Sequence, residues 1–133
     1  MGDRKVRILI ADDQPQVRSA VRLILGQKSR LIVVGEAENL AKTRELVSGE
    51  QPDILLLDWE LPGWKNATDL AILRKSRPGL TVVALSGRPE SRRMALAAGV
   101  NAFVSKGEPP ERLLAAVERC CTDENQDVSP PHH

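Results

Sequence analysis

The sequence predicts an α/β fold in which a doubly wound five-stranded parallel sheet is covered by helices on both faces, giving three αβα layers. The chain has 133 residues, of which 41% are hydrophobic and 28% are charged, as is usual for one compact domain. Short apolar runs alternate with segments of helical periodicity. The runs are almost continuously apolar, which is typical of parallel strands buried on both faces, and right-handed crossovers then wind the sheet in both directions.

Five short runs are typical of strands. The third, Ile54–Leu57, is wholly apolar, and the second, Leu31–Val34, is rich in β-branched residues. The expected strands are residues 6–11, 31–34, 54–57, 80–85 and 102–104.

Five segments between and after these strands are typical of helices. Residues 14–27 carry apolar side chains at positions 17, 20, 21, 24 and 25, which lie on one helix face. Asn39 is a good N-cap for the second helix, and Pro110 suits the first turn of the last. The expected helices are residues 14–27, 40–48, 67–77, 89–98 and a segment from residue 110 onward.

Composition limits the classes of function. The net charge of +1 gives no reason to expect binding to nucleic acid or to an anionic membrane. No apolar run is long enough to span a membrane and no signal peptide is recognisable, so we expect a cytoplasmic location. We expect a domain over residues 5–121 and a disordered polar tail over residues 122–133. Cys120 and Cys121 are expected to be reduced, with one facing the core.

Polar residues follow or end four of the expected strands. Asp12 and Asp13 follow the first strand, Asp58 ends the third, Ser86 follows the fourth and Lys106 lies just after the fifth. In an open parallel sheet these positions meet at one edge, where ligands bind. Three carboxylates repel one another unless a cation such as Mg²⁺, or alternatively Mn²⁺, lies between them. A carboxylate beside a metal and a lysine is a plausible phosphoryl acceptor.

Each residue of this set also has a purely structural interpretation. An isolated aspartate after a strand is usually a helix cap, and Asp58 alone could cap the turn at Pro62-Gly63. Ser86 alone could be a loop hydroxyl and Lys106 a solvated charge. The functional interpretation therefore depends on all five residues occurring together.

These residues resemble the receiver domain of two-component response regulators, from about Lys5 to Cys121. The motifs are Ile8-Leu-Ile-Ala-Asp-Asp13, Leu55-Leu-Leu-Asp58 with Pro62-Gly63, Val82-Val-Ala-Leu-Ser86 and Ala102-Phe-Val-Ser-Lys106. The sequences of these motifs are most similar to those of receivers that precede a LuxR-type helix-turn-helix output domain. The resemblance implies a flavodoxin-like strand order of 2-1-3-4-5.

The resemblance also implies roles for the acidic residues. Asp58 matches the phosphorylated aspartate, and Asp12 and Asp13 match the acidic pair that binds Mg²⁺ together with Asp58. The backbone carbonyl of Glu60 matches a further protein ligand of that metal.

Three other residues match the family's catalytic and switch positions. Lys106 matches the lysine that pairs with the phosphoryl group, and Ser86 matches the hydroxyl that turns toward it. Phe103, the only Phe in the chain, matches an aromatic switch, although a static core aromatic would look the same in the sequence. The implied partners are a histidine kinase or phosphotransfer protein and a downstream protein, with phosphorylation as a candidate trigger of homodimer formation. No metabolic activity and no direct nucleic-acid or membrane binding are expected.

The sequence departs from the family pattern at several positions. Asn66 replaces a common Gly, Gly107 replaces the Pro that commonly follows the lysine, and Trp64 replaces a common Met. Glu60 and Arg88 lie where the family tunes the lifetime of the phosphoryl group, and both could equally be solvated loop charges.

Two other classes of function compete with the receiver interpretation, a phosphatase and a flavin-nucleotide binder. An aspartate-nucleophile phosphatase needs an acid two residues after the nucleophile, where Glu60 lies, but the Asp12–Asp13 pair argues against this class. A flavin-nucleotide binder needs a hydroxyl- or glycine-rich loop after the first strand, where these two acids would repel phosphate. No DNA-binding domain follows Cys121. Because the chain starts at Met and ends in a polar tail, we expect a stand-alone receiver, the alternative being the receiver piece of a longer DNA-binding regulator.

Overall fold

The computed structural model describes the backbone of residues 4–65 and 67–128, and the side chains of these residues as far as Cys121. Its five parallel strands have the order β2-β1-β3-β4-β5, so the predicted topology is confirmed. The strands are β1 (Val6–Ala11), β2 (Leu31–Ala37), β3 (Ile54–Asp58), β4 (Thr81–Ser86) and β5 (Ala102–Ser105).

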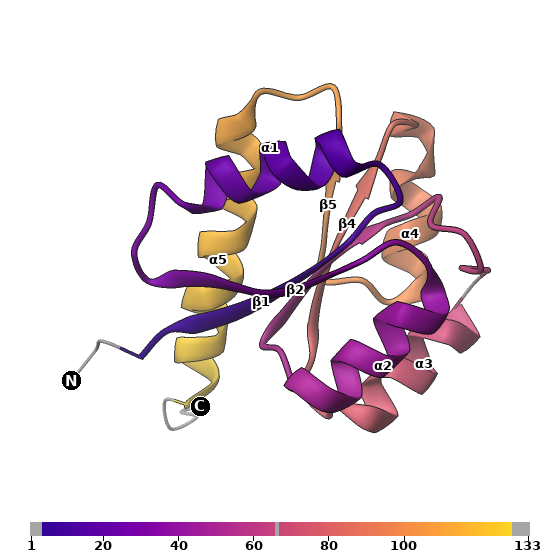
Figure 1. Cartoon of the computed structure of the whole chain (residues 1–133), viewed down its shortest axis with the longest axis horizontal. Helices are drawn as coiled ribbons and strands as arrows, with labels where there is room; N and C mark the ends of the chain where they lie inside the picture. Colours follow the sequence, from indigo (N-terminus) through magenta and orange to yellow (C-terminus); the bar gives the residue numbers. More distant parts are fainter. Residues whose placement is uncertain (1–3, 66, 129–133) are drawn as a thin grey trace.

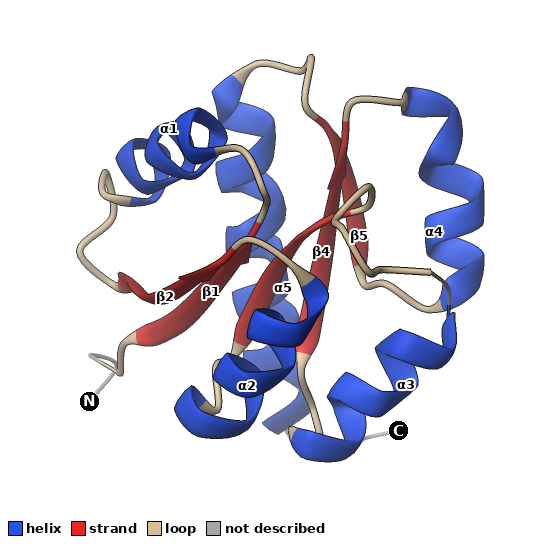
Figure 2. Cartoon of the chain, turned by 45° about the vertical axis from the view of Figure 1, so that its right-hand side comes forward, coloured by secondary structure: helices blue, strands red, loops and turns tan. Residues whose placement is uncertain are grey.

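The helices lie on both faces of the sheet, with α1 and α5 on one side and α2, α3 and α4 on the other (Figures 1 and 2). They are α1 (Pro15–Leu25), α2 (Leu40–Glu50), α3 (Ala67–Ser76), α4 (Arg92–Ala98) and α5 (Pro110–Val128), with a 3₁₀ turn η1 (Pro89–Ser91) before α4. No helix among residues 4–65 and 67–128 is both long and apolar enough to cross a membrane.

Two hydrophobic cores result from the alternation of side chains along each strand. Ile8 and Ile10 of β1 face α1 and α5, whereas Leu9 of the same strand faces the side of α2, α3 and α4. Leu56 and Leu55 of β3 divide in the same way. Burial on both faces fixes the position of the two central strands, and hence of the residues at their carboxyl ends.

Several element boundaries differ from the sequence prediction. β2 continues through Gly35 to Ala37, because Gly35 pairs with Leu9 after a register shift that leaves Val34 unpaired. A Cβ at Gly35 would lie 3.3 Å from side-chain atoms of both Leu46 and Leu9, so the glycine permits close packing of α2. The predicted helix over 89–98 is divided into η1 and α4, and Gly99 ends α4 with a left-handed φ of 111°.

The C-terminal region differs from expectation in two respects. Both Cys120 and Cys121 are buried against the α1–α5 core, where only one was expected to face inward. Helix α5 continues to Val128, past the position where the predicted tail begins. Residues 129–133 of that tail lie outside the described residues, and the division at residue 121 stays a prediction.

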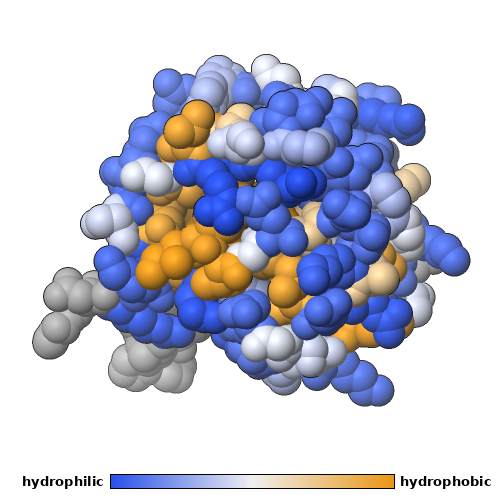
Figure 3. All heavy atoms as spheres, in the orientation of Figure 1, coloured by the Kyte–Doolittle hydropathy of each residue, from blue (hydrophilic) through white to orange (hydrophobic). Residues whose placement is uncertain are grey.

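The surface is mostly polar where Figure 3 shows it, with a hydrophobic patch over the edge strand β2. Ile32 on this strand is 39% exposed.

Candidate functional site

Three carboxylates gather at the carboxyl edge of the sheet, as predicted. β1 and β3 are neighbours, with Ala11 paired to Leu57, so Asp12, Asp13 and Asp58 follow or end adjacent strands. One oxygen from each carboxylate lies within 4.8 Å of the others; Asp12 and Asp58 are buried, and Asp13 is exposed. Oxygen ligands with one side open to water suit Mg²⁺, so this donor set fits the predicted metal.

Local turns orient the two buried carboxylates. Asp12 Oδ1 accepts a hydrogen bond of 2.9 Å from the backbone N–H of Gln14, just before α1. Asp58 Oδ1 accepts one of 3.0 Å from the backbone N–H of Glu60. The turn-capping role that an isolated aspartate would have is therefore present, in addition to the clustering of the acids.

Lys106 reaches into this cluster from the end of β5. Its Nζ lies 2.8 Å from Asp12 Oδ2 and 3.5 Å from Asp58 Oδ1. Burial by itself would lower the pKa of Lys106, but the close contact with Asp12 and the charges of Asp58 and Asp12 outweigh it and raise the pKa above its ordinary value. Lys106 is thus a fixed positive charge between the two buried acids.

The pKa of Asp58 is raised above the ordinary aspartate value. The main cause is burial, to which the negative charges of Asp12 and Glu60 add. The hydrogen bond from the Glu60 N–H and the charge of Lys106 act in the opposite direction without cancelling the effect. An ionised Asp58 is therefore short of positive partners, as expected of a group that binds a cation.

Ser86 ends β4 next to β3, and its hydroxyl contacts Glu60. Ser86 Oγ donates a hydrogen bond of 2.7 Å to Glu60 Oε2 and accepts one of 2.9 Å from the backbone N–H of Arg88. The N–H of Gly87 also points to Glu60 Oε1, at 3.4 Å. From the sequence, the Glu60 side chain was expected to tune the phosphoryl lifetime or to be a solvated loop charge, and its contact with Ser86 was not predicted.

Phe103 is buried among the side chains between β5 and α4. The guanidinium of Arg92 lies 5.0 Å from the centroid of its ring, and Arg92 also lies 3.8 Å from Glu108 Oε2. Phe103 is therefore in contact with the helix that follows Ser86, on the side of the sheet away from α5.

Arg18 supports the site and was also missed. Its Nη1 donates to the backbone carbonyl of Asp12 at 2.7 Å, and its Nε donates to Glu36 Oε1 at 2.7 Å. The hydrogen bond from Arg22, followed by that from Arg18, lowers the pKa of Glu36. Arg18 thus joins α1, the end of β2 and the Asp12 turn; an arginine five residues after an acidic pair was the only signal in the sequence.

The structure describes two of the three positions at which the sequence departs from the family pattern, Gly107 and Trp64. No peptide bond in the described residues is cis, so the Lys106–Gly107 bond is trans. Trp64 packs on Trp59 with ring centroids 5.6 Å apart. Asn66 lies outside the described residues.

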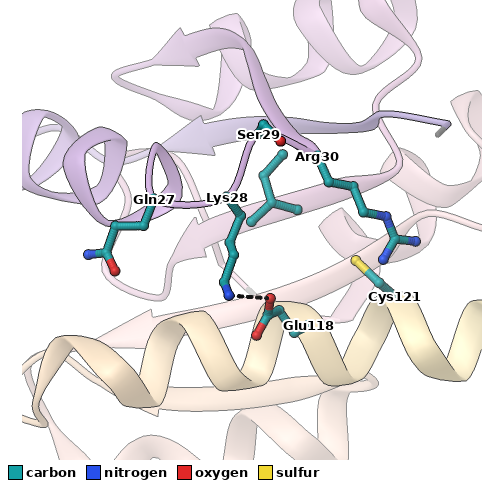
Figure 4. A pocket seen from close by; sticks show the side chains of 7 residues that line it. Gln27, Lys28, Ser29, Arg30, Glu118 and Cys121 are labelled. Atoms are coloured by element: carbon teal, nitrogen blue, oxygen red, sulfur yellow. Dashed lines mark ion pairs between the residues drawn. The ribbon is translucent and has the colours of Figure 1, made fainter.

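A hollow lies at the opposite edge of the sheet, where β2 begins (Figure 4). Lys28 and Glu118 form an ion pair of 3.7 Å across it, and Arg30 and Cys121 lie beside them. No group of three acids, histidines or cysteines able to hold a metal occurs here among the described residues. The carboxyl edge is therefore the better candidate site.

Known proteins match this sequence over most of its length. The model of the response regulator receiver domain matches residues 8–118. The nitrate/nitrite response regulator protein NarL of Escherichia coli K12 is 35% identical over 119 residues, covering 88% of this chain and 55% of NarL. The probable transcriptional regulatory protein NarL of Mycobacterium tuberculosis is 32% identical over 129 residues, covering 96% and 59%. The chain therefore spans little more than half the length of these curated relatives.

A solved structure agrees with these matches. The signal receiver domain of the Mycobacterium tuberculosis response regulator described as NarL superposes with a TM-score of 0.79 at 31% identity, covering 90% of this chain and 98% of that one. Given the sheet order, the acidic edge and a family match over most of its length, this chain belongs to the response regulator receiver domain family.

Proposed function

We propose that Asp58 accepts a phosphoryl group from a phosphohistidine of a histidine kinase or phosphotransfer protein in a Mg²⁺-dependent reaction. The observation that carries this proposal is the cluster of Asp12, Asp13 and Asp58, whose oxygens lie within 4.8 Å of one another beside Lys106. The family is one of signalling proteins, and this chain would act as a signal carrier rather than a metabolic enzyme.

In the proposed reaction a carboxylate oxygen of Asp58 attacks phosphorus and forms an O–P bond while the N–P bond to the donor imidazole breaks. The imidazole leaves with the nitrogen electron pair and takes a proton. Asp12, Asp13, Asp58 and the Glu60 carbonyl would hold Mg²⁺, which supplies positive charge to the transferring oxygens. Lys106 Nζ, already 3.5 Å from Asp58, would pair with the same oxygens, and Ser86 would donate its hydroxyl to them.

The acyl phosphate would then change the conformation of the receiver. Ser86 and Phe103 both lie next to the η1–α4 segment, through the loop after β4 and through Arg92 respectively. Phosphorylation would bias a two-state equilibrium of this segment, and slow hydrolysis would return the resting state. That this chain is a stand-alone receiver stays a prediction, with a longer DNA-binding regulator as the alternative. Homodimer formation on phosphorylation also stays a prediction.

A phosphatase remains the alternative of a different class. Glu60 occupies the position that it requires, but its carboxylate is hydrogen-bonded to Ser86. Sustained turnover of a generic phosphomonoester would support the phosphatase and overturn the receiver proposal.

The proposal is tested by incubating the protein with Mg²⁺ and acetyl phosphate or phosphoramidate and measuring the intact mass. We expect one phosphoryl adduct in the wild type and none in Asp58→Asn. Asp53→Asn is the matched control, because Asp53 is the buried carboxylate at the other end of β3, and it should keep the adduct. An equal adduct in Asp58→Asn would place the acceptor elsewhere. A protein that reacts with neither donor is tested with a phosphorylated histidine phosphotransfer protein, and no adduct there would refute the proposal.

A further inference from the structure

The carboxylate of Glu60 joins the loops that follow β3 and β4. Oε2 accepts the hydroxyl hydrogen of Ser86 at 2.7 Å, and Oε1 faces the N–H of Gly87 at 3.4 Å. The short contact from a neutral hydroxyl to an ionised oxygen is of the stronger, charge-assisted kind. Glu60 itself is exposed, so nothing in its packing forces the carboxylate into this position.

The two donors that Glu60 engages lie at the edge where the proposed phosphoryl group would be held. Ser86 is paired in the sheet with Ser105, next to Lys106, and Leu85 is paired with Asp58. A phosphoryl group on Asp58 needs hydrogen-bond donors from this edge. Ser86 has a single hydroxyl hydrogen, so it cannot donate to Glu60 and to a phosphoryl oxygen at the same time.

We propose that Glu60 is an internal competitor of the phosphoryl group, whose carboxylate occupies Ser86 and Gly87 in the resting protein. This inference rests on the proposed function and assigns the Glu60 side chain a part separate from that of its backbone carbonyl. The carboxylate acts before phosphorylation, by stabilising the state in which the Ser86 hydroxyl donates to Glu60. Binding of a phosphoryl group must displace it, and this lowers the apparent affinity of the site for such a group.

Substitution of Glu60 should therefore increase affinity for a phosphoryl mimic. With Mg²⁺ present, we expect Glu60→Ala to bind beryllofluoride about three- to tenfold more tightly than the wild type, the range of an ordinary hydrogen bond, because water competes for the exposed carboxylate. Glu60→Gln keeps an acceptor oxygen without the charge, so its affinity for beryllofluoride should lie between those of the wild type and Glu60→Ala. Calorimetric titration measures this equilibrium without interference from hydrolysis.

Loss of a negative charge near the site would also favour an anion, and a double-mutant cycle separates the two effects. In a Ser86→Ala background most of the gain from Glu60→Ala should disappear, because no hydroxyl remains to be released. Glu90→Ala, which removes an exposed acid of the neighbouring turn η1, should leave the affinity unchanged.

The outcomes distinguish this inference from the proposed function. Equal gains with and without the Ser86 hydroxyl, or no gain at all, would overturn the competitor role while leaving Asp58 as the acceptor. Absence of beryllofluoride binding in the wild type, or equal binding by Asp58→Asn, would refute the proposed function itself. Because Glu60 is exposed, both of its variants should fold, which unchanged circular dichroism would verify.

Discussion

The two ends of β3 each carry a buried carboxylate, but the surroundings of the two differ. At the beginning, Asp53 accepts hydrogen bonds from the backbone N–H of Arg7 at 2.9 Å and from Arg77 and Arg4 at 3.2 and 3.3 Å. At the end, Asp58 has one backbone donor and a lysine at 3.5 Å that lies closer to Asp12. The negative charge of Asp53 is balanced by donors within the protein. Asp58 instead shares the positive charge of Lys106 with Asp12, so its own charge is only partly balanced.

This difference separates a structural acid from a functional one more clearly than burial does, since both residues are buried. A compensated carboxylate stabilises the fold and has no unused capacity for a ligand. A buried carboxylate whose charge is only partly balanced lowers the stability of the fold until a bound cation or a covalently attached group balances or removes that charge. The following predictions test that contrast.

The largest effect on stability is expected at Asp53. Asp53→Asn places an amide N–H₂ group among three donors, and we expect the free energy of unfolding to fall by about 2–3 kcal/mol, as when one partner of a buried ion pair is removed. Urea denaturation measures this change. Glu45→Gln, which alters an exposed acid on α2, should change stability by less than about 0.5 kcal/mol. A similarly small change in Asp53→Asn would show that the two ends of β3 do not differ as described.

Mg²⁺ should stabilise only the Asp58 end. At ten times its dissociation constant, Mg²⁺ should add about 1.4 kcal/mol to the free energy of unfolding of the wild type. Thermal unfolding with and without the ion measures this gain, which Asp13→Ala should largely remove. Because the pKa of Asp58 is raised, protons compete with the metal, so the gain should decline as the pH is lowered. Equal stabilisation of Asp13→Ala would indicate a different metal site.

Removing the charge of Asp58 should stabilise the metal-free protein, in contrast to Asp53. The unfolded chain releases the Asp58 proton more readily than the folded protein does, because burial raises the folded pKa. Ionised Asp58 therefore opposes folding above its folded pKa, and this cost disappears when the pH falls below the unfolded value. We expect Asp58→Asn to add about 1 kcal/mol at neutral pH. Denaturation curves should converge with the wild type on acidification; an advantage independent of pH would contradict this explanation.

The smallest expected effect is spectroscopic. Trp59 follows Asp58 directly, so Mg²⁺ binding should change its fluorescence, and Asp13→Ala should abolish that change. Trp64 contacts Trp59 and would mix the two signals, so Trp64→Phe is the suitable background. Fluorescence that does not respond to Mg²⁺ would show that the indole does not sense the site.

Sequence periodicity was sufficient to predict the parallel sheet and the edge where the acids meet, and the family resemblance implied the strand order. Continuous apolar strands such as Ile54–Leu57 can be buried only on both faces, and their carboxyl ends must then converge. The gathering of Asp12, Asp13, Asp58 and Lys106 follows from that convergence, and the family resemblance supplied the expected roles.

Tertiary structure alone decided which partner each polar group has. The extension of β2 through Gly35 depends on pairing with β1 and on close packing of Leu46, neither of which local propensity contains. The contacts of Glu60 with Ser86 and of Arg18 with Asp12 join residues 26 and 6 positions apart. Asp53 and Asp58 flank the same apolar run, and the sequence singles out Asp58 by its place at the carboxyl end and by the family resemblance. Only the fold shows that arginines pair with Asp53, whereas Asp58 shares Lys106 with Asp12.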